Sequence, residues 1–148
     1  MVKISLTEQV SVVTLSGITH ESESEFVSAI FSAAAENGIN IDMISKTAIT
    51  TDRTNIGFTF SDNDMPKMLL ILGRLSLVLP PLVSCGNTKV VIKSDEMIDA
   101  VGFAKKVFEL LAEIKITPLM ITTSVDEISL VIRSDESDIT TKSLQRII

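Results

Sequence analysis

A chain of 148 residues is long enough for one domain or two small ones. Its 13 basic residues are scattered and its net charge is −6, a distribution that disfavours nucleic-acid binding, which needs clustered lysines and arginines. The single cysteine, Cys85, excludes an internal disulfide framework and suits a reducing compartment, so we expect a cytoplasmic protein. The chain starts without the apolar run of a signal peptide, and Arg74 and Pro80-Pro81 interrupt its most apolar region, which argues against a membrane span.

The first half of the chain predicts a strand, a helix, two strands and a second helix. Ser22 and Glu25 fit an S-x-x-E capping box at a helix start, and Gly38 is the expected left-handed stop after that helix. Pro66 suits the first turn of the next helix. The expected elements are strand Val10–Ser16, a helix from the Ser22 region to about Asn37, strands Ile39–Ile49 and Asn55–Ser61, and a helix beginning near Pro66.

The second half repeats this pattern. Phe31 and Phe108 are 77 positions apart, and at the same offset "GINIDMISKTA" (Gly38–Ala48) corresponds to "KITPLMITTSV" (Lys115–Val125). The offset later falls to 72, because one loop of the second copy is shorter. The expected elements are strand Lys89–Lys93, a helix from about Met97 to Ile114, strands Ile116–Val125 and Glu127–Arg133, and a short helix from about Asp138.

This order of elements predicts an α+β protein of two ferredoxin-like βαββαβ units, each an antiparallel sheet with helices on one face. The first copy has a candidate fourth strand in "SLVL" (Ser76–Leu79), whereas the second copy has none after its last helix. The spare segment Val2–Leu6 would complete the second sheet. We therefore expect interleaved units, one formed by residues 8–80 and the other by residues 1–7 with 81–148.

The ordered pair of repeats resembles the regulatory region of aspartokinases, a pair of ACT domains. "AENGINIDMI" (Ala35–Ile44) and "TDRTNIGFTFSDND" (Thr51–Asp64) are similar to parts of the family's first ACT domain. "ITTSVDEISLVI" (Ile121–Ile132) is similar to the matching part of the second. The resemblance implies a regulatory protein that binds an amino acid between ACT domains of two chains, with lysine or threonine as the effector.

The resemblance also implies where an effector would bind: the loop before the first helix and the second strand of each repeat. Two positions depart from the family, because Ser24-Glu25 stands in place of a Pro-Gly pair and Val101 replaces the Pro before Gly102. The acidic rim of the first loop favours lysine over threonine. The candidate effector-binding residues are Ser22, Glu23, Ser24, Asn40, Asp42, Met43, Lys46, Thr117 and Pro118.

Catalysis is not expected of this chain. It has no P-loop, its only histidine is His20, and both first loops lack the arginine that an acylphosphatase needs. No catalytic residue, metal site or cofactor is predicted, and no membrane or nucleic-acid partner. We expect a homodimer, since 45% of the residues are apolar, and a biosynthetic enzyme as a further partner. Two alternatives stay open: a structural dimerisation module with a decayed effector site, and the detached regulatory part of an aspartokinase.

Overall fold

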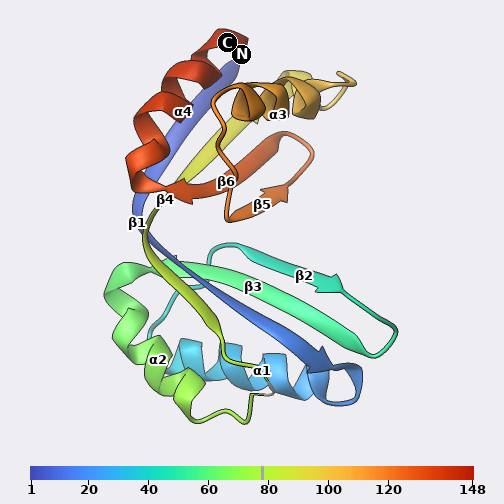
Figure 1. Cartoon of the computed structure of the whole chain (residues 1–148), viewed down its shortest axis with the longest axis vertical. Helices are drawn as coiled ribbons and strands as arrows, with labels where there is room; N and C mark the ends of the chain where they lie inside the picture. The colour runs from blue at the N-terminus through green and yellow to red at the C-terminus, as the bar shows by residue number, and fades with distance from the viewer. Residues whose placement is uncertain (78) are drawn as a thin grey trace. The chain divides into compact units, whose positions relative to one another are not determined.

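The computed structural model describes residues 1–77 and 79–148, with the side chains of residues 20–22 outside the description. The protein has an α+β fold, as predicted, with strands in the order β2-β3-β1-β4-β6-β5 and four α-helices within the described residues (Figure 1). It divides into two compact units. The first unit is Gln9–Cys85, and the second unit combines Met1–Glu8 with Gly86–Ile148.

Two long strands belong to both units. β1 (Val2–Thr19) and β4 (Leu82–Ser94) are hydrogen-bonded neighbours, and each crosses a boundary between the units. The first unit therefore has the strand order β2-β3-β1-β4, and the second unit has the order β1-β4-β6-β5. This arrangement confirms the predicted pair of interleaved ferredoxin-like sheets. The assignment of each unit to one ACT domain, with the limits given above, stays a prediction.

The first unit packs two helices against its sheet (Figure 1). α1 (His20–Glu36) and α2 (Met65–Gly73) cover β2 (Ile44–Ala48), β3 (Arg53–Ser61) and the parts of β1 and β4 in this unit. Alternation along β3 turns Ile56, Phe58 and Phe60 toward the helices. The Phe31 ring on α1 meets Phe58 edge-on at 5.5 Å between centroids. The fully buried members of this core include Val13, Leu15, Ile30, Phe58 and Met68.

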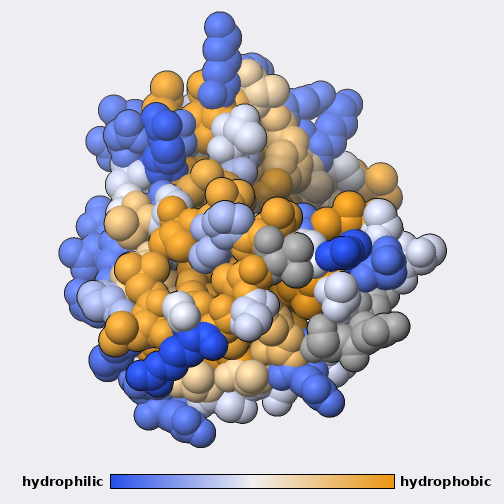
Figure 2. All heavy atoms as spheres, turned by 60° about the horizontal axis from the view of Figure 1, so that its bottom comes forward, coloured by the Kyte–Doolittle hydropathy of each residue, from blue (hydrophilic) through white to orange (hydrophobic). Residues whose placement is uncertain are grey.

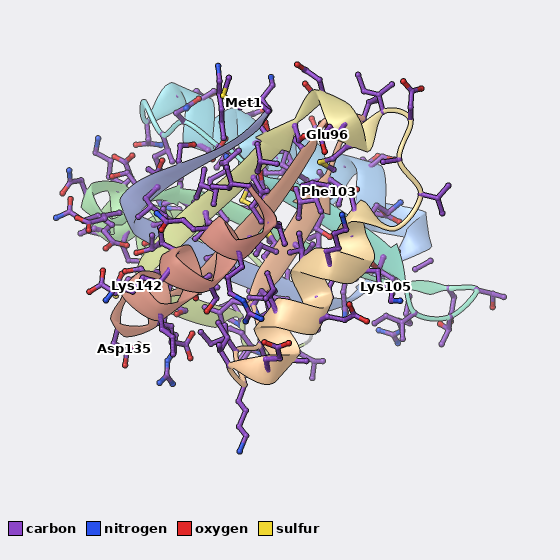
Figure 3. All side chains as sticks on the ribbon, turned by 90° about the horizontal axis from the view of Figure 1, so that it is seen from above. Met1, Glu96, Phe103, Lys105, Asp135 and Lys142 are labelled. Carbon is purple, nitrogen blue, oxygen red and sulfur yellow. The ribbon has the colours of Figure 1, made fainter. Side chains whose placement is uncertain are left out.

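The second unit repeats this arrangement with β6 (Glu127–Arg133) between β4 and β5 (Met120–Thr123). α3 (Phe103–Glu113) and α4 (Ser137–Leu144) lie side by side over the sheet (Figure 3). Val2 from the start of the chain is buried in this core, and the Met1 ammonium lies 3.8 Å from Glu96 Oε1. The core consists mainly of Val90, Ile92, Val107, Leu111, Ile128, Leu130, Ile132 and Leu144.

Several strands differ from the sequence prediction. The predicted strands Val2–Leu6 and Val10–Ser16 are parts of one strand, β1, and β4 extends well beyond the predicted Lys89–Lys93. The strand predicted for Ile116–Val125 is regular only from Met120 to Thr123.

The regular strand β2 begins at Ile44 instead of Ile39, although the Asp42 amide still donates to Thr59 O at 3.0 Å. The described residues of "SLVL" are not a strand, and Val78 lies outside the described residues. The fourth strand of the first unit is the start of β4 at Leu82, directly after Pro80-Pro81. Proline has no N–H to donate to a ladder, so regular pairing resumes only after this dipeptide.

Two helix starts also differ. α1 begins at His20 with Thr19 as its N-cap, so Ser22 and Glu25 lie inside the helix and the predicted capping box does not start it. α3 begins at Phe103 and not near Met97, because Asp95–Met97 form a short 3-10 turn. In that turn Ser94 Oγ accepts a hydrogen bond from the Glu96 amide at 3.2 Å. The apolar periodicity identified both helices but not the local turns that precede them.

The long helices of the two repeats end in the same way. In the first repeat Gly38 N–H donates to Ala35 O and Ile39 N–H to Ala34 O. In the second repeat Lys115 N–H donates to Ala112 O and Ile116 N–H to Leu111 O. Both are Schellman caps, and both require a left-handed residue, with φ of +69° at Gly38 and +57° at Lys115. The second repeat thus places a lysine where glycine is the unstrained choice.

Replacing Lys115 by glycine is expected to increase the free energy of unfolding by about 1 kcal/mol, because glycine relieves the steric conflict of a left-handed L-residue. Gly38→Ala should lower it by a similar amount. Urea denaturation measures both changes. Lys115→Ala is the matched control, since it removes the side chain but keeps the Cβ atom, and it should change stability little. A Lys115→Gly variant no more stable than the wild type would contradict this account.

Deleting residues 1–7 is expected to loosen the second unit more than the first, since Val2 and the strand that carries it complete the second core. Amide hydrogen exchange should accelerate in β6 and in residues 86–94 more than in β2 and β3. As single-residue versions, Val2→Ala at a buried position should cost roughly 1–2 kcal/mol, whereas Leu6→Ala at an exposed one should stay within about 0.5 kcal/mol. Equal acceleration in both units would argue against this role of the N-terminal strand.

Candidate functional site

β1 runs directly into α1, so the irregular end of β1 around Gly17, here called the first loop, takes the place of the predicted loop. Gly17 has φ of +70°, and the pairing of β1 with β3 shifts register between Leu15 and Ile18. Asn55 Oδ1 accepts from Gly17 N–H at 3.1 Å, and Arg53 Nη1 donates to Gly17 O at 2.9 Å. Both backbone polar groups of Gly17 are thus hydrogen-bonded to side chains of β3. Because these two groups are already bonded, the chain enters α1 with a defined backbone path.

Sequence reasoning did not select Gly17, Arg53 or Asn55. The available signal was a glycine at the end of a β-branched strand, which often marks a bulge. Arg53 and Asn55 alternate along the strand on the face opposite the Ile56 side chain, a pattern that looked like solvent exposure. Pairing between residues 36 and 38 positions apart leaves no trace in a single sequence.

A small cavity opens beside this loop. Its volume is about 60 Å³, which is room for a few atoms of a ligand or for water, and far below the roughly 300–1,000 Å³ of a typical ligand pocket. The backbone at the end of β1 forms one wall and the segment after α2 another. The residues that line it are Ser16, Gly17, Ile18, Thr19, Phe26, Ser76 and Leu77. The cavity can therefore supply part of a binding site but cannot enclose a whole amino acid.

Beside the first turn of α1, an acid, a base and a hydroxyl come together from three elements. Glu23 on α1 forms an ion pair with Lys46 on β2, with Oε1 and Nζ 2.5 Å apart. The Thr54 hydroxyl on β3 donates to Glu23 Oε2 at 3.3 Å. The Glu23 side chain is only 13% exposed, whereas that of Lys46 is 52% exposed. Of the predicted site residues, Glu23 and Lys46 are thus in direct contact.

The remaining predicted residues of the first unit do not form one cluster. Ser24, Asn40 and Asp42 are exposed, and the side chain of Ser22 lies outside the described residues. Met43 is buried, and its amide donates to Thr59 Oγ1 at 2.9 Å. Met43 therefore contributes packing and backbone order at the start of β2, while the two residues before it that were predicted, Asn40 and Asp42, reach solvent.

Thr117 and Pro118 belong to the second unit, in the segment between α3 and β5. Thr117 is exposed and Pro118 is half-buried. One acidic side chain of this unit, Asp126, forms an ion pair in which its Oδ2 lies 3.2 Å from Lys93 Nζ. The hydrogen bond from Lys93 lowers the pKa of the Asp126 carboxyl below its ordinary value. Gly102, which matches the family's glycine, is left-handed with φ of +99° and caps α3.

Comparison with known proteins places this geometry in a family context. A family model described as an ACT domain matches residues 90–146. An aspartokinase of Geobacillus stearothermophilus is 36% identical over 129 residues, which are 87% of this chain and 31% of that protein. The chain carries an ACT domain and resembles the regulatory region of aspartokinases. It spans about a third of the length of the curated relatives it matches.

Solved structures share the fold of this chain. The ligand-free regulatory subunit of aspartate kinase from Thermus thermophilus superposes with a TM-score of 0.83 at 21% identity, covering 97% of this chain and 95% of that one. Aspartokinase III of E. coli in complex with lysine and aspartate, in the T-state, gives a TM-score of 0.71 at 18% identity, covering 97% of this chain and 32% of that one. The fold of these regulatory regions therefore extends over nearly the whole chain.

Two further observations concern metal ions and membranes. Among the described residues, no three His, Cys, Asp or Glu side chains gather closely enough to hold a metal ion. Within the same part of the chain, no helix is both long and apolar enough to cross a membrane. Near the first loop, the main polar features are the hydrogen bonds of Gly17 with Asn55 and Arg53 and the ion pair of Glu23 with Lys46.

Proposed function

We propose that this chain is a regulatory module that binds an amino acid and passes the binding signal to an enzyme of amino-acid biosynthesis. The likeness to aspartokinase regulatory regions over 87% of the chain supports an allosteric regulatory role and is the observation that carries the proposal. Each compact unit is assigned to one ACT domain. The regulated enzyme is either a kinase domain in the same polypeptide or a separate partner. The free, exposed Cys85 fits a cytoplasmic location.

The effector site is assigned to the start of α1 and the neighbouring strand in the first unit. In this region Arg53 holds the first loop by a hydrogen bond to Gly17 O, and a small cavity lies beside that loop. The polar cluster of Glu23, Lys46 and Thr54 belongs to the same region. Asn40 and Asp42, both exposed just before β2, offer further polar contacts. The proposal keeps Thr117 and Pro118 of the partner subunit in a homodimer as the opposite wall of the site. Ser22, Ser24 and Met43 complete the set of residues through backbone groups or packing.

Lysine is the effector that the local charge favours. Glu23 on the first turns of α1 and Asp42 just before β2 each present a carboxylate, and a cationic amino acid is attracted where an additional carboxylate would be repelled. One structure of a related protein, E. coli aspartokinase III, contains lysine together with aspartate. In this proposal Asp42 receives an ammonium group of the effector. Backbone amides at the start of α1 receive its carboxylate, as helix N-termini do elsewhere.

The alternative function is a structural dimerisation module whose effector site has decayed. The cavity of about 60 Å³ favours this alternative, because an intact site would bury most of its ligand. The exposed apolar surface of the first unit favours association in either case. Figure 2 shows apolar side chains gathered on the surface turned forward, and the exposed apolar residues of this unit include Leu69, Leu70, Leu79, Leu82 and Val83.

Isothermal titration calorimetry of the purified chain with lysine, threonine, methionine and the branched-chain amino acids tests the effector assignment. Lysine is expected to bind, and Asp42→Ala should weaken it about tenfold, equivalent to ~1.4 kcal/mol. Asp138→Ala is the matched control, because it removes an exposed aspartate from α4 in the second unit and should leave binding unchanged. Absence of binding by all amino acids at millimolar concentration would favour the structural module. Binding that is insensitive to Asp42→Ala would keep the function but reject this place for the ammonium.

Native mass spectrometry at micromolar concentration tests assembly. A homodimer of twice the 16.1 kDa chain is expected, because pairing removes exposed apolar surface from water. Replacing Leu70 and Leu82, both more than half exposed, by lysine should shift the population toward monomer without unfolding the chain, as circular dichroism would verify. A wild-type chain that is monomeric throughout this range would overturn the dimer.

A further inference from the structure

The two side chains of the ion pair beside α1, Glu23 and Lys46, differ in how freely they can move. Glu23 is held from two sides, by Lys46 on β2 and by the hydroxyl of Thr54, and Thr54 itself is fully buried. Only 13% of the Glu23 side chain is exposed, so its carboxylate has lost most of its hydration and depends on a nearby cation. Lys46 lies on β2, the edge strand of the first unit, and half of its side chain reaches water.

Lys46 can therefore leave this position more easily than Glu23 can. A lysine has four flexible methylenes and a well-hydrated ammonium, so rotating it into solvent exchanges one favourable environment for another. Glu23 cannot rotate into solvent in the same way, because it lies on the first turns of α1 and faces β2 and β3. If Lys46 moved away, the carboxylate would remain as a partly buried site for another ammonium group.

The fold does not require this pair. At the 77-residue offset of the repeats, Glu23 corresponds to Ala100 and Lys46 to Thr123, so the second repeat has no such pair at these two positions. Lysine–carboxylate pairs of the second unit, such as Lys93 with Asp126 and Lys105 with Glu109, come from other positions, and their side chains reach solvent. Glu23 has no acidic counterpart in the second repeat and lies beside the loop assigned to the effector. This combination points to a role in binding.

We propose that Lys46 is a tethered occupant of an ammonium subsite on Glu23, and that a cationic amino acid binds the first unit by displacing it with its side-chain ammonium. This inference rests on the proposed function and deepens it, because it names the group that the effector must replace. The side-chain ammonium of free lysine is chemically the same group as Lys46 Nζ, so the exchange leaves Glu23 paired.

Tethering sets the concentration at which such an effector acts. A group attached to the same chain competes at a high effective concentration, commonly millimolar. The apparent affinity of the free effector is then reduced in proportion to the fraction of time during which the Lys46 ammonium is away from Glu23. Removing the tethered ammonium should therefore tighten binding of a cationic effector, whereas removal of an ordinary contact residue would weaken it.

Calorimetry with L-lysine and L-norleucine on wild type, Lys46→Met, Glu23→Gln and the double variant tests this inference. Norleucine has the shape of lysine without the side-chain ammonium. Lys46→Met is expected to tighten lysine binding on the order of tenfold and to leave norleucine unchanged, while Glu23→Gln should weaken lysine on the order of tenfold. Lys93→Met is the matched control. It breaks the ion pair of Lys93 with Asp126 in the second unit and should leave the affinity for both ligands unchanged.

Circular dichroism and thermal unfolding of each variant establish that it is folded, and the double variant replaces the ion pair by two neutral groups if a single change unfolds the chain. Lysine binding that Lys46→Met leaves unchanged or weakens would overturn the inference and leave the proposed function standing. An equal gain for lysine and norleucine would also overturn it. Binding detected only after Lys46→Met would support it most directly. No binding to any variant would overturn both the inference and the proposed function.

Discussion

Neither sheet of this protein can be completed from one continuous half of the chain. β1 and β4 each supply hydrogen-bonding groups to both compact units, so the second sheet needs residues from the start of the chain and the first needs residues that follow Pro80-Pro81. The buried Val2 side chain adds an apolar contact to this backbone pairing. Most other features follow from this sharing, including the position of the helices and the loop that enters α1.

The crossing points of the shared strands have a local conformational requirement. The unit boundaries fall at Gln9 and Gly86, and both residues are left-handed, with φ of +57° and +70°. These positions correspond at the 77-residue offset of the repeats. Glycine meets this requirement without steric conflict, whereas glutamine does so against a penalty of roughly 1–2 kcal/mol. As at the helix ends, one repeat holds glycine and the other tolerates a side chain, so the surrounding pairing imposes the conformation.

Much of the architecture could be predicted from the sequence, because it depends on periodic patterns. The alternation of Ile56, Phe58 and Phe60 and the helical spacing of Val107, Leu110 and Leu111 determined which face of each element is buried. The missing fourth strand in the second repeat indicated the interleaving. The error over "SLVL" arose because an apolar run was given more weight than the proline pair that follows it. The periodic signal also could not reveal that short turns delay the start of α3.

The candidate site was less predictable for a different reason. Polar side chains are distributed without a period, and their partners lie far away in the sequence, as with Arg53 and Gly17 or Thr54 and Glu23. Glu23 was interpreted as an exposed charge that would repel a carboxylate. In the structure it faces β2 and is paired with Lys46, which neutralises it. The difference between these two interpretations depends on one side-chain direction, which three-dimensional packing determines.

The shared strands also determine the order in which the protein can fold during synthesis. The ribosome releases Val2–Glu8 long before Gly86 and the strands that follow it, so this segment emerges without the sheet it completes. The first unit must likewise wait for Leu82 before its own fourth strand is present. Pairings between residues so distant in sequence form slowly, and until they form an apolar strand edge stays open to other chains. The sheet of the second unit can therefore close only after Gly86 and the strands that follow it have been synthesised and can pair with Val2–Glu8.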